Sequence, residues 1–126
     1  MTNYGDYYYC EICGQVISVL CPGNPSLVCC GQKMSLLKDN TVDASKEKHV
    51  PVIVPEGDVT TIKVGSAPHP MTEEHHIVFI EIVRKNGLVD RARLAVGGPP
   101  EATFPIKADD IAEVYAYCNL HSLWKA

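Results

Sequence analysis

The chain has 126 residues, of which 46% are hydrophobic and 21% charged, with a formal net charge of −4. This length and composition are typical of one or two small globular domains. The acidic balance and the lack of any block of Lys or Arg in the sequence argue against nucleic acid or an anionic membrane as a partner.

The N-terminal segment, residues 1–9, is polar and aromatic and lacks the apolar stretch of a secretory signal. The longest apolar runs are far shorter than the ~20 residues that span a bilayer. We therefore expect a cytoplasmic protein without membrane association. In that reducing compartment, six cysteines indicate metal or redox chemistry rather than a disulfide framework.

Residues 1–37 form the first predicted domain. Two short strands are predicted at 7–9 and 15–20, with turn-forming Gly and Pro residues around them. A segment of this length buries too little apolar surface to offset its chain entropy. A structural metal is the usual remedy, so we predict a small metal-stabilised domain.

A set of thiols in this domain has metal-ligand spacing. Cys10 and Cys13 are followed sixteen residues later by the adjacent pair Cys29 and Cys30. A thioredoxin-like dithiol would open a helix in a βαβ unit, which the sequence does not predict. Zinc ribbons use two Cys-x-x-Cys pairs, so the adjacent pair needs a different backbone bend. Iron and zinc both fit four thiolates, and Cys21 has no assigned role.

Residues 38–126 form the second predicted domain, which begins with a polar linker at 38–48 with room for one helical turn. Short β-rich runs follow, and Asn86-Gly87 between two of them is a strong hairpin signal. Their spacing is typical of a β-sandwich or barrel, so the fold class is mainly β. The predicted strands cover residues 49–54, 59–64, 76–83, 88–96, 102–106 and 111–117.

A second set of donors in this domain is rich in imidazole. It comprises His49, His69, one of the adjacent residues His75 and His76, and the pair Cys118 and His121 near the C-terminus. This concentration of histidines with one distant thiol indicates a second metal site. Adjacent side chains in a strand point to opposite faces, so only one of the adjacent histidines is expected to bind. The spacing does not say which one.

Copper electron transfer is a less favoured alternative for this second site. A β-sandwich with upstream histidines and a C-terminal Cys and His is typical of blue copper proteins. Those sites take a weak axial Met, but none of the five residues after His121 is Met, and Met71 lies upstream. The number of histidines is also too high.

Together these motifs resemble desulfoferrodoxin, the two-iron class of superoxide reductase. The resemblance spans nearly the whole chain, and its most specific parts are Glu-Lys-His-Val-Pro at 47–51 and Tyr-Cys-Asn-Leu-His-Ser-Leu-Trp-Lys at 117–125. Cys21 and the turn at 22–25 are departures from the family pattern. The remaining matches lie at residues 9–14, 28–31, 40–43, 64–65 and 69–71.

The resemblance implies a desulforedoxin-like domain followed by an immunoglobulin-like β-sandwich, each with one iron ion. It implies that superoxide is reduced by one electron to hydrogen peroxide, with electrons from a rubredoxin-like donor protein, in a homodimer. The implied ligands of the first iron are Cys10, Cys13, Cys29 and Cys30, and those of the second, catalytic iron are His49, His69, His75, Cys118 and His121.

Two charged residues, Glu47 and Lys48, directly precede His49. Without the resemblance, they would be a solvated surface pair. The resemblance implies that Lys48 attracts superoxide and orients a proton-donating water, and that Glu47 closes the oxidised site. It also implies that Cys118 is the axial ligand, opposite an open position.

Three other functions remain open from the sequence. The protein could be an electron carrier whose iron is bound by sulfur and which has no superoxide chemistry. It could be a zinc-stabilised binding module, which would be colourless. A superoxide dismutase is the closest enzymatic alternative; it would return oxygen as well as peroxide and need no external reductant.

Overall fold

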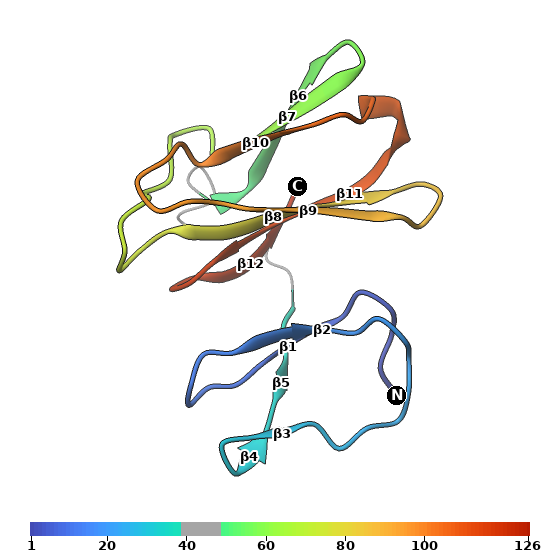
Figure 1. The fold of residues 1–126 in the computed structure, drawn as a ribbon, viewed down its shortest axis with the longest axis vertical. Coiled ribbons are helices and arrows are strands. Elements are labelled where there is room, and N and C mark those ends of the chain that lie inside the picture. The colour runs from blue at the N-terminus through green and yellow to red at the C-terminus, as the bar shows by residue number, and fades with distance from the viewer. Residues whose placement is uncertain (39–48) are drawn as a thin grey trace. The chain divides into compact units, whose positions relative to one another are not determined.

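The computed structural model describes residues 1–38 and 49–126. The predicted helical turn in the linker and the residues Glu47 and Lys48 lie outside the described residues. The chain divides into two compact units, Met1–Lys38 and Asp39–Ala126, which are called the N-terminal and C-terminal units below. Figure 1 draws both units with their strands labelled.

The N-terminal unit contains a small antiparallel sheet and a separate two-stranded hairpin. In the sheet, β1 lies between β2 and β5, and the hairpin pairs β3 with β4. The strands predicted at 7–9 and 15–20 are confirmed, the second in shorter form. The hairpin and β5 were not predicted, because strands of two residues have no recognisable period. The bounds are β1 Tyr7–Tyr9, β2 Val16–Ser18, β3 Val28–Cys29, β4 Gln32–Lys33 and β5 Ser35–Leu36.

The adjacent cysteines lie at the turn of the β3–β4 hairpin. Cys30 and Gly31 both have positive φ, 53° and 79°, and they connect Cys29 to Gln32. Two central residues with positive φ are typical of the tight turns that match the twist of a hairpin. A positive φ is uncommon for a residue other than glycine. This is the unusual bend that two adjacent thiol ligands require.

The C-terminal unit is a β-sandwich of two antiparallel sheets that face each other (Figure 1). One sheet has the order β10-β7-β6 and the other β12-β11-β8-β9. The prediction of a mainly β protein with an immunoglobulin-like sandwich is confirmed. A short 3-10 helix, Ala108–Asp110, precedes β11. The bounds are β6 Pro51–Glu56, β7 Val59–Val64, β8 Ile77–Arg84, β9 Val89–Arg93, β10 Glu101–Phe104, β11 Ile111–Cys118 and β12 Ser122–Lys125.

Alternating residues of these strands form the core between the sheets. Ile80 and Ile82 of β8 lie in it with Val114 and Ala116 of β11, and all four side chains are almost fully buried. Such alternation follows from the period of two in a strand. Cys118, the last residue of β11, belongs to the same cluster. The sandwich therefore holds one sulfur at the end of a core strand.

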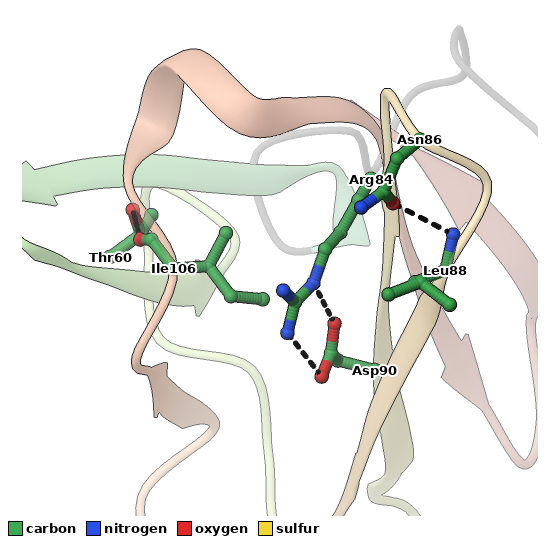
Figure 2. A network of polar contacts seen from close by, with 6 residues as sticks. All are labelled: Thr60, Arg84, Asn86, Leu88, Asp90 and Ile106. Carbon is green, nitrogen blue, oxygen red and sulfur yellow. Dashed lines mark hydrogen bonds and ion pairs between the residues drawn. The ribbon is translucent and has the colours of Figure 1, made fainter.

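The hairpin predicted at Asn86-Gly87 is confirmed and joins β8 to β9. Gly87 has a φ of 90°, and the backbone N–H of Leu88 donates to Oδ1 of Asn86 at 3.0 Å. Arg84 donates from Nε and Nη2 to Asp90 at 2.6 and 3.0 Å, which ties the two strands together beside the turn (Figure 2). These contacts fix the register of the β8–β9 hairpin. They lie at the end of β8 that is opposite to the end where Cys118 pairs.

The end of the chain differs from the sequence-based prediction, in which Cys118 and His121 followed the last strand. Residues Ser122–Lys125 form a further strand, β12, which pairs with β11. Cys118 and His121 therefore bracket a hairpin turn, and Ser122 leaves that turn with a φ of 72°. Among residues 1–38 and 49–126, no helix has the length and apolarity needed to cross a membrane.

Candidate metal centres

The four predicted thiols of the N-terminal unit lie together. All their sulfur atoms are within 4.8 Å of one another. Sγ of Cys29 lies 3.7 Å from Sγ of Cys13 and 4.0 Å from Sγ of Cys30. Four sulfurs at metal bonds of about 2.3 Å in a tetrahedron are separated by about 3.8 Å. The spacing therefore fits a metal ion bound by four thiolates.

Local backbone hydrogen bonds shape the Cys10–Cys13 turn. The N–H of Gly14 donates to the carbonyl of Cys10, and the N–H of Cys10 donates to the carbonyl of Gln15, both at 2.9 Å. The backbone N–H of Cys13 also lowers the pKa of Cys10 to about 7. In contrast, the neighbouring Cys10 and Cys13 raise the pKa of Cys29 to about 12. Since four thiolates this close repel one another, their joint ionisation requires a cation.

The C-terminal unit brings the five predicted donors of the second set together. The ligand atoms of His49, His69, His75, Cys118 and His121 all lie within 4.8 Å of one another. Nε2 of His49 is 3.0 Å from Nδ1 of His121, and Sγ of Cys118 is 3.8 Å from the same nitrogen. Two nitrogens at right angles on one metal, with bonds of about 2.1 Å, are also about 3.0 Å apart.

The side chains of His75 and His76 point to different surroundings, as expected for adjacent residues. Both residues precede β8 rather than lying within it. The ring of His75 packs edge-on against those of His69 and His121, with centroids 4.7 and 4.9 Å apart. Nδ1 of His76 instead lies 3.0 Å from the carbonyl oxygen of Thr72. The structure therefore places His75 in the donor cluster and His76 outside it.

His69 is held in the form that a metal ligand needs. Its Nδ1–H donates to the carbonyl of Pro70 at 2.7 Å, which directs Nε2 away from that loop. Nε2 is buried and has no hydrogen-bond partner in the part of the chain that the structure describes. Burial lowers the pKa of His69 to about 4, so the ring is neutral at pH 7. A neutral imidazole oriented by its second nitrogen is typical of metal sites.

Burial differs among the five donors. Cys118, His49 and His69 are buried, whereas His121 is exposed. Burial raises the pKa of Cys118, so this thiol keeps its proton at neutral pH until a cation displaces it. The sulfur thus lies on the core side of the cluster and His121 on the solvent side.

The donors come from the same end of several strands. His49 precedes β6, His69 follows β7, His75 precedes β8, and Cys118 and His121 bracket the β11–β12 turn. An aromatic residue that the sequence did not single out, Trp124 of β12, lies beside them, and its indole stacks on His49. Its position three residues after His121 gives no signal in the sequence alone.

Residues 41–126 match the family described as desulfoferrodoxin, and residues 2–37 match the desulfoferrodoxin N-terminal domain. The chain belongs to the desulfoferrodoxin family. A desulfoferrodoxin from Syntrophotalea carbinolica is 50% identical over 121 residues, which cover 96% of this chain and 94% of that relative. The predicted resemblance is therefore confirmed.

Two proteins named superoxide reductase are also similar to this chain. The crystal structure of the superoxide reductase from Treponema pallidum is 32% identical and covers 96% of both chains, with a TM-score of 0.79. A superoxide reductase from Pyrococcus abyssi is 38% identical over 109 residues, which cover 71% of this chain and 95% of that relative.

Family membership and the two donor sets give this chain two iron ions. One is of the Fe(Cys)4 type in the N-terminal unit, and the other is of the Fe(His)4(Cys) type in the C-terminal unit. The donor chemistry fits both, because thiolates and imidazoles are ligands of iron. The prediction of two different iron centres is thus confirmed.

Proposed function

We propose that the protein is a superoxide reductase that converts superoxide to hydrogen peroxide at the centre in the C-terminal unit. The observation that carries this proposal is the convergence of one buried thiol and four imidazoles within 4.8 Å. The similar chains named superoxide reductase from Treponema pallidum and Pyrococcus abyssi support it. An electron carrier without superoxide chemistry could use the tetrathiolate iron alone. It would not need a second centre of four imidazoles and one thiol.

The residues that hold the catalytic iron are His49, His69, His75, Cys118 and His121. When bound, the ferrous ion supplies the single electron that, with two protons, converts superoxide to hydrogen peroxide. Four neutral imidazoles and one thiolate leave a net charge of +1 on the ferrous centre, which favours an anionic substrate. Cys10, Cys13, Cys29 and Cys30 hold the other iron.

Burial of the donors suggests how the substrate approaches. Cys118 lies in the core cluster of the sandwich, so it would hold the iron from the protein side, as the family resemblance implies for the axial ligand. His121 lies on the solvent side of the donor set, from which superoxide would approach. The thiolate of Cys118 would supply electron density to a bound iron, as thiolates do in haem enzymes.

Lys48 and Glu47 are proposed as the catalytic side chains beside this site. The supporting observation is that they directly precede His49 in the sequence. A lysine about 6 Å from the substrate attracts it by roughly 2–3 kcal/mol at an effective dielectric constant of 20. This local attraction matters because the formal net charge of −4 repels an anion. With iron bound, Glu47 would supply a carboxylate that closes the oxidised site, as the family resemblance implies.

The proposal also includes the partners and the location of the protein. Net reduction of superoxide needs an external reductant. We propose that a rubredoxin-like protein delivers these electrons, so that the protein takes part in electron transport. We further propose a cytoplasmic homodimer with domains at 1–37 and 38–126. Reducing conditions in the cytoplasm would keep the six thiols available for metal.

Superoxide kinetics on the purified iron-loaded protein test the function. A superoxide reductase consumes superoxide rapidly, yields peroxide without oxygen, and stays oxidised until a reductant is added. A dismutase would release oxygen and need no reductant, and an electron carrier would cycle reversibly without consuming superoxide. Cys118→Ser should abolish the thiolate-to-iron charge-transfer band of the catalytic centre; its survival would exclude Cys118 as the sulfur ligand.

Capture of superoxide by Lys48→Ala, measured by pulse radiolysis at low salt, tests the role of the lysine. We expect a second-order rate constant that is lower by up to ~10-fold, since steering by charge has effects of ~10–10³. An unchanged rate constant would remove Lys48 from the mechanism.

A further inference from the structure

One side chain links two of the loops that carry the donors. Asn119 follows Cys118 in the turn between β11 and β12. Its Nδ2–H donates to the carbonyl of Glu74 at 2.9 Å, and its Oδ1 accepts from the backbone N–H of His76 at 2.9 Å. Its own backbone N–H donates to the carbonyl of His76 at 3.2 Å. These three bonds flank His75 on both sides.

The position of Asn119 explains why a side chain is needed there. Pairing between β11 and β8 ends at Cys118 and Ile77, after a register shift between Tyr117 and Cys118. Beyond this point the backbone N–H of Asn119 still donates to the carbonyl of His76, but the bonds to the N–H of His76 and to the carbonyl of Glu74 come from the side chain of Asn119. The side-chain amide of Asn119 has an NH2 donor group and a carbonyl acceptor, so it can pair with a backbone as a peptide unit does. In this way it continues the hydrogen bonding between β11 and the β8 side past the last paired residues.

Residues 72–75, which precede β8, form a turn that is closed by hydrogen bonds between its own ends. Thr72 and His75 exchange backbone hydrogen bonds at 2.9 and 3.2 Å, and the hydroxyl of Thr72 donates to the carbonyl of His75 at 3.2 Å. This turn fixes the shape of residues 72–75 but not their place relative to β11. The bonds from Asn119 supply that placement.

We propose that Asn119 is a positioning residue that sets His75 relative to Cys118 and so determines how tightly the second donor set holds its metal. The inference rests on the proposed function only in taking these two residues as ligands of one iron. Asn119 belongs to neither donor set, and the hydrogen bonds of its side chain go to backbone groups of Glu74 and His76. Its effect is transmitted by the peptide units on either side of His75.

The test compares Asn119→Ala with the native protein in its oxidised, two-iron form. Each ferric centre is followed by its own EPR signal during a challenge with EDTA. Loss of outer partners of metal ligands typically costs 10–100-fold in metal affinity. We therefore expect iron to leave the second centre ~10–100-fold faster, and the thiolate-to-iron charge-transfer band to shift. The Fe(Cys)4 signal should decay at the native rate and serves as an internal control.

Asn86→Ala is the matched control, because Asn86 also holds a turn by its side chain but at the β8–β9 hairpin (Figure 2). It should release iron from both centres at the native rate. Native release from Asn119→Ala, or equal acceleration in both variants, would overturn the proposal. If Asn119→Ala does not fold, Asn119→Asp replaces it, since it keeps the acceptor for His76 and loses the donor to Glu74. Native release from that variant would likewise overturn the proposal.

None of these measurements uses superoxide, so they are independent of the proposed activity. A native protein that fails to consume superoxide would contradict the function but leave the role of Asn119 in metal retention intact. Conversely, a superoxide reductase whose Asn119→Ala variant retains iron normally would contradict only the positioning role.

Discussion

The indole of Trp124 stacks on the imidazole of His49, with ring centroids 4.7 Å apart and planes inclined by 19°. The same indole donates its Nε1–H to the carbonyl of His121 at 2.8 Å. One buried side chain of β12 thus contacts two donors that are 72 residues apart in the sequence. It supports the first donor by packing and the last by a hydrogen bond.

Trp124→Phe should separate these two contributions, because it keeps an aromatic ring beside His49 and removes the hydrogen bond to His121. We expect a loss of about 1 kcal/mol in the free energy of unfolding of the C-terminal unit. Urea denaturation of the iron-loaded protein measures this loss. Trp124→Leu, which also removes the aromatic ring, should lose more. A Phe variant as stable as the native protein would show that the hydrogen bond contributes nothing.

Removal of iron should unfold the N-terminal unit. The hydrophobic side chains that are buried in residues 1–38 are those of Tyr7 and Cys10, and the latter is a proposed ligand. Structural metals in such small folds supply roughly 10–16 kcal/mol of apparent folding free energy. After chelation under reducing conditions, the amide resonances of residues 1–38 should lose their dispersion in ¹H–¹⁵N spectra. Dispersion that persists in the metal-free protein would contradict this prediction, and reloading with iron should restore it.

Gly31→Ala should weaken the β3–β4 hairpin that presents Cys29 and Cys30. Gly31 has a φ of 79°, and an added Cβ would meet no atom within 4 Å, so the cost is conformational. A left-handed conformation costs an L-residue roughly 1–2 kcal/mol. The midpoint of urea-induced loss of Fe(Cys)4 absorption should fall accordingly. Gly23→Ala is the control, because Gly23 has equal space without a positive φ; an equal fall in both would reject the explanation.

Glu81→Gln should be at least as stable as the native protein at pH 7. Glu81 is 2% exposed, and burial raises its pKa even though Arg91 donates to it at 3.3 Å. The fold therefore favours the protonated carboxyl, and stability falls as the pH rises from about 4.5 through the pKa of the folded state. Since Gln cannot ionise, we expect a gain of about 1 kcal/mol at pH 7 that disappears near pH 4.5. Chemical denaturation at both pH values measures it.

Glu113→Gln provides the opposite case on the neighbouring strand. Hydrogen bonds from Tyr115 and Lys125 lower the pKa of Glu113, so its contribution is present above pH 4.5 and is lost as the pH falls through the lowered value. We expect this variant to lose roughly 0.5 kcal/mol at pH 7, because the Lys125 ion pair is partly exposed. If both glutamine variants changed stability in the same direction at pH 7, burial would not be the cause of the difference.

Some elements followed from local sequence alone. Asn86-Gly87 predicted the β8–β9 hairpin, and Gly87 provides the positive φ of that turn, which glycine adopts without steric cost. The run 59–64 was predicted with the bounds that β7 has. Strands β3, β4, β5 and β12 were missed, because each depends on a partner strand rather than on a pattern of its own.

The sequence by itself determined the chemistry of the two donor sets, because ligand preference is a property of the side-chain type and close spacing is visible without a fold. It thereby predicted one centre of four thiolates and another rich in imidazole. The spacing left His75 and His76 open and the family resemblance implied His75; the tertiary structure places His75 in the second set and His76 outside it. Only the tertiary structure showed that Asn119 and Trp124 lie beside this set. Those outcomes depend on where β8, β11 and β12 end relative to one another, and strand pairing over distant segments determines that register.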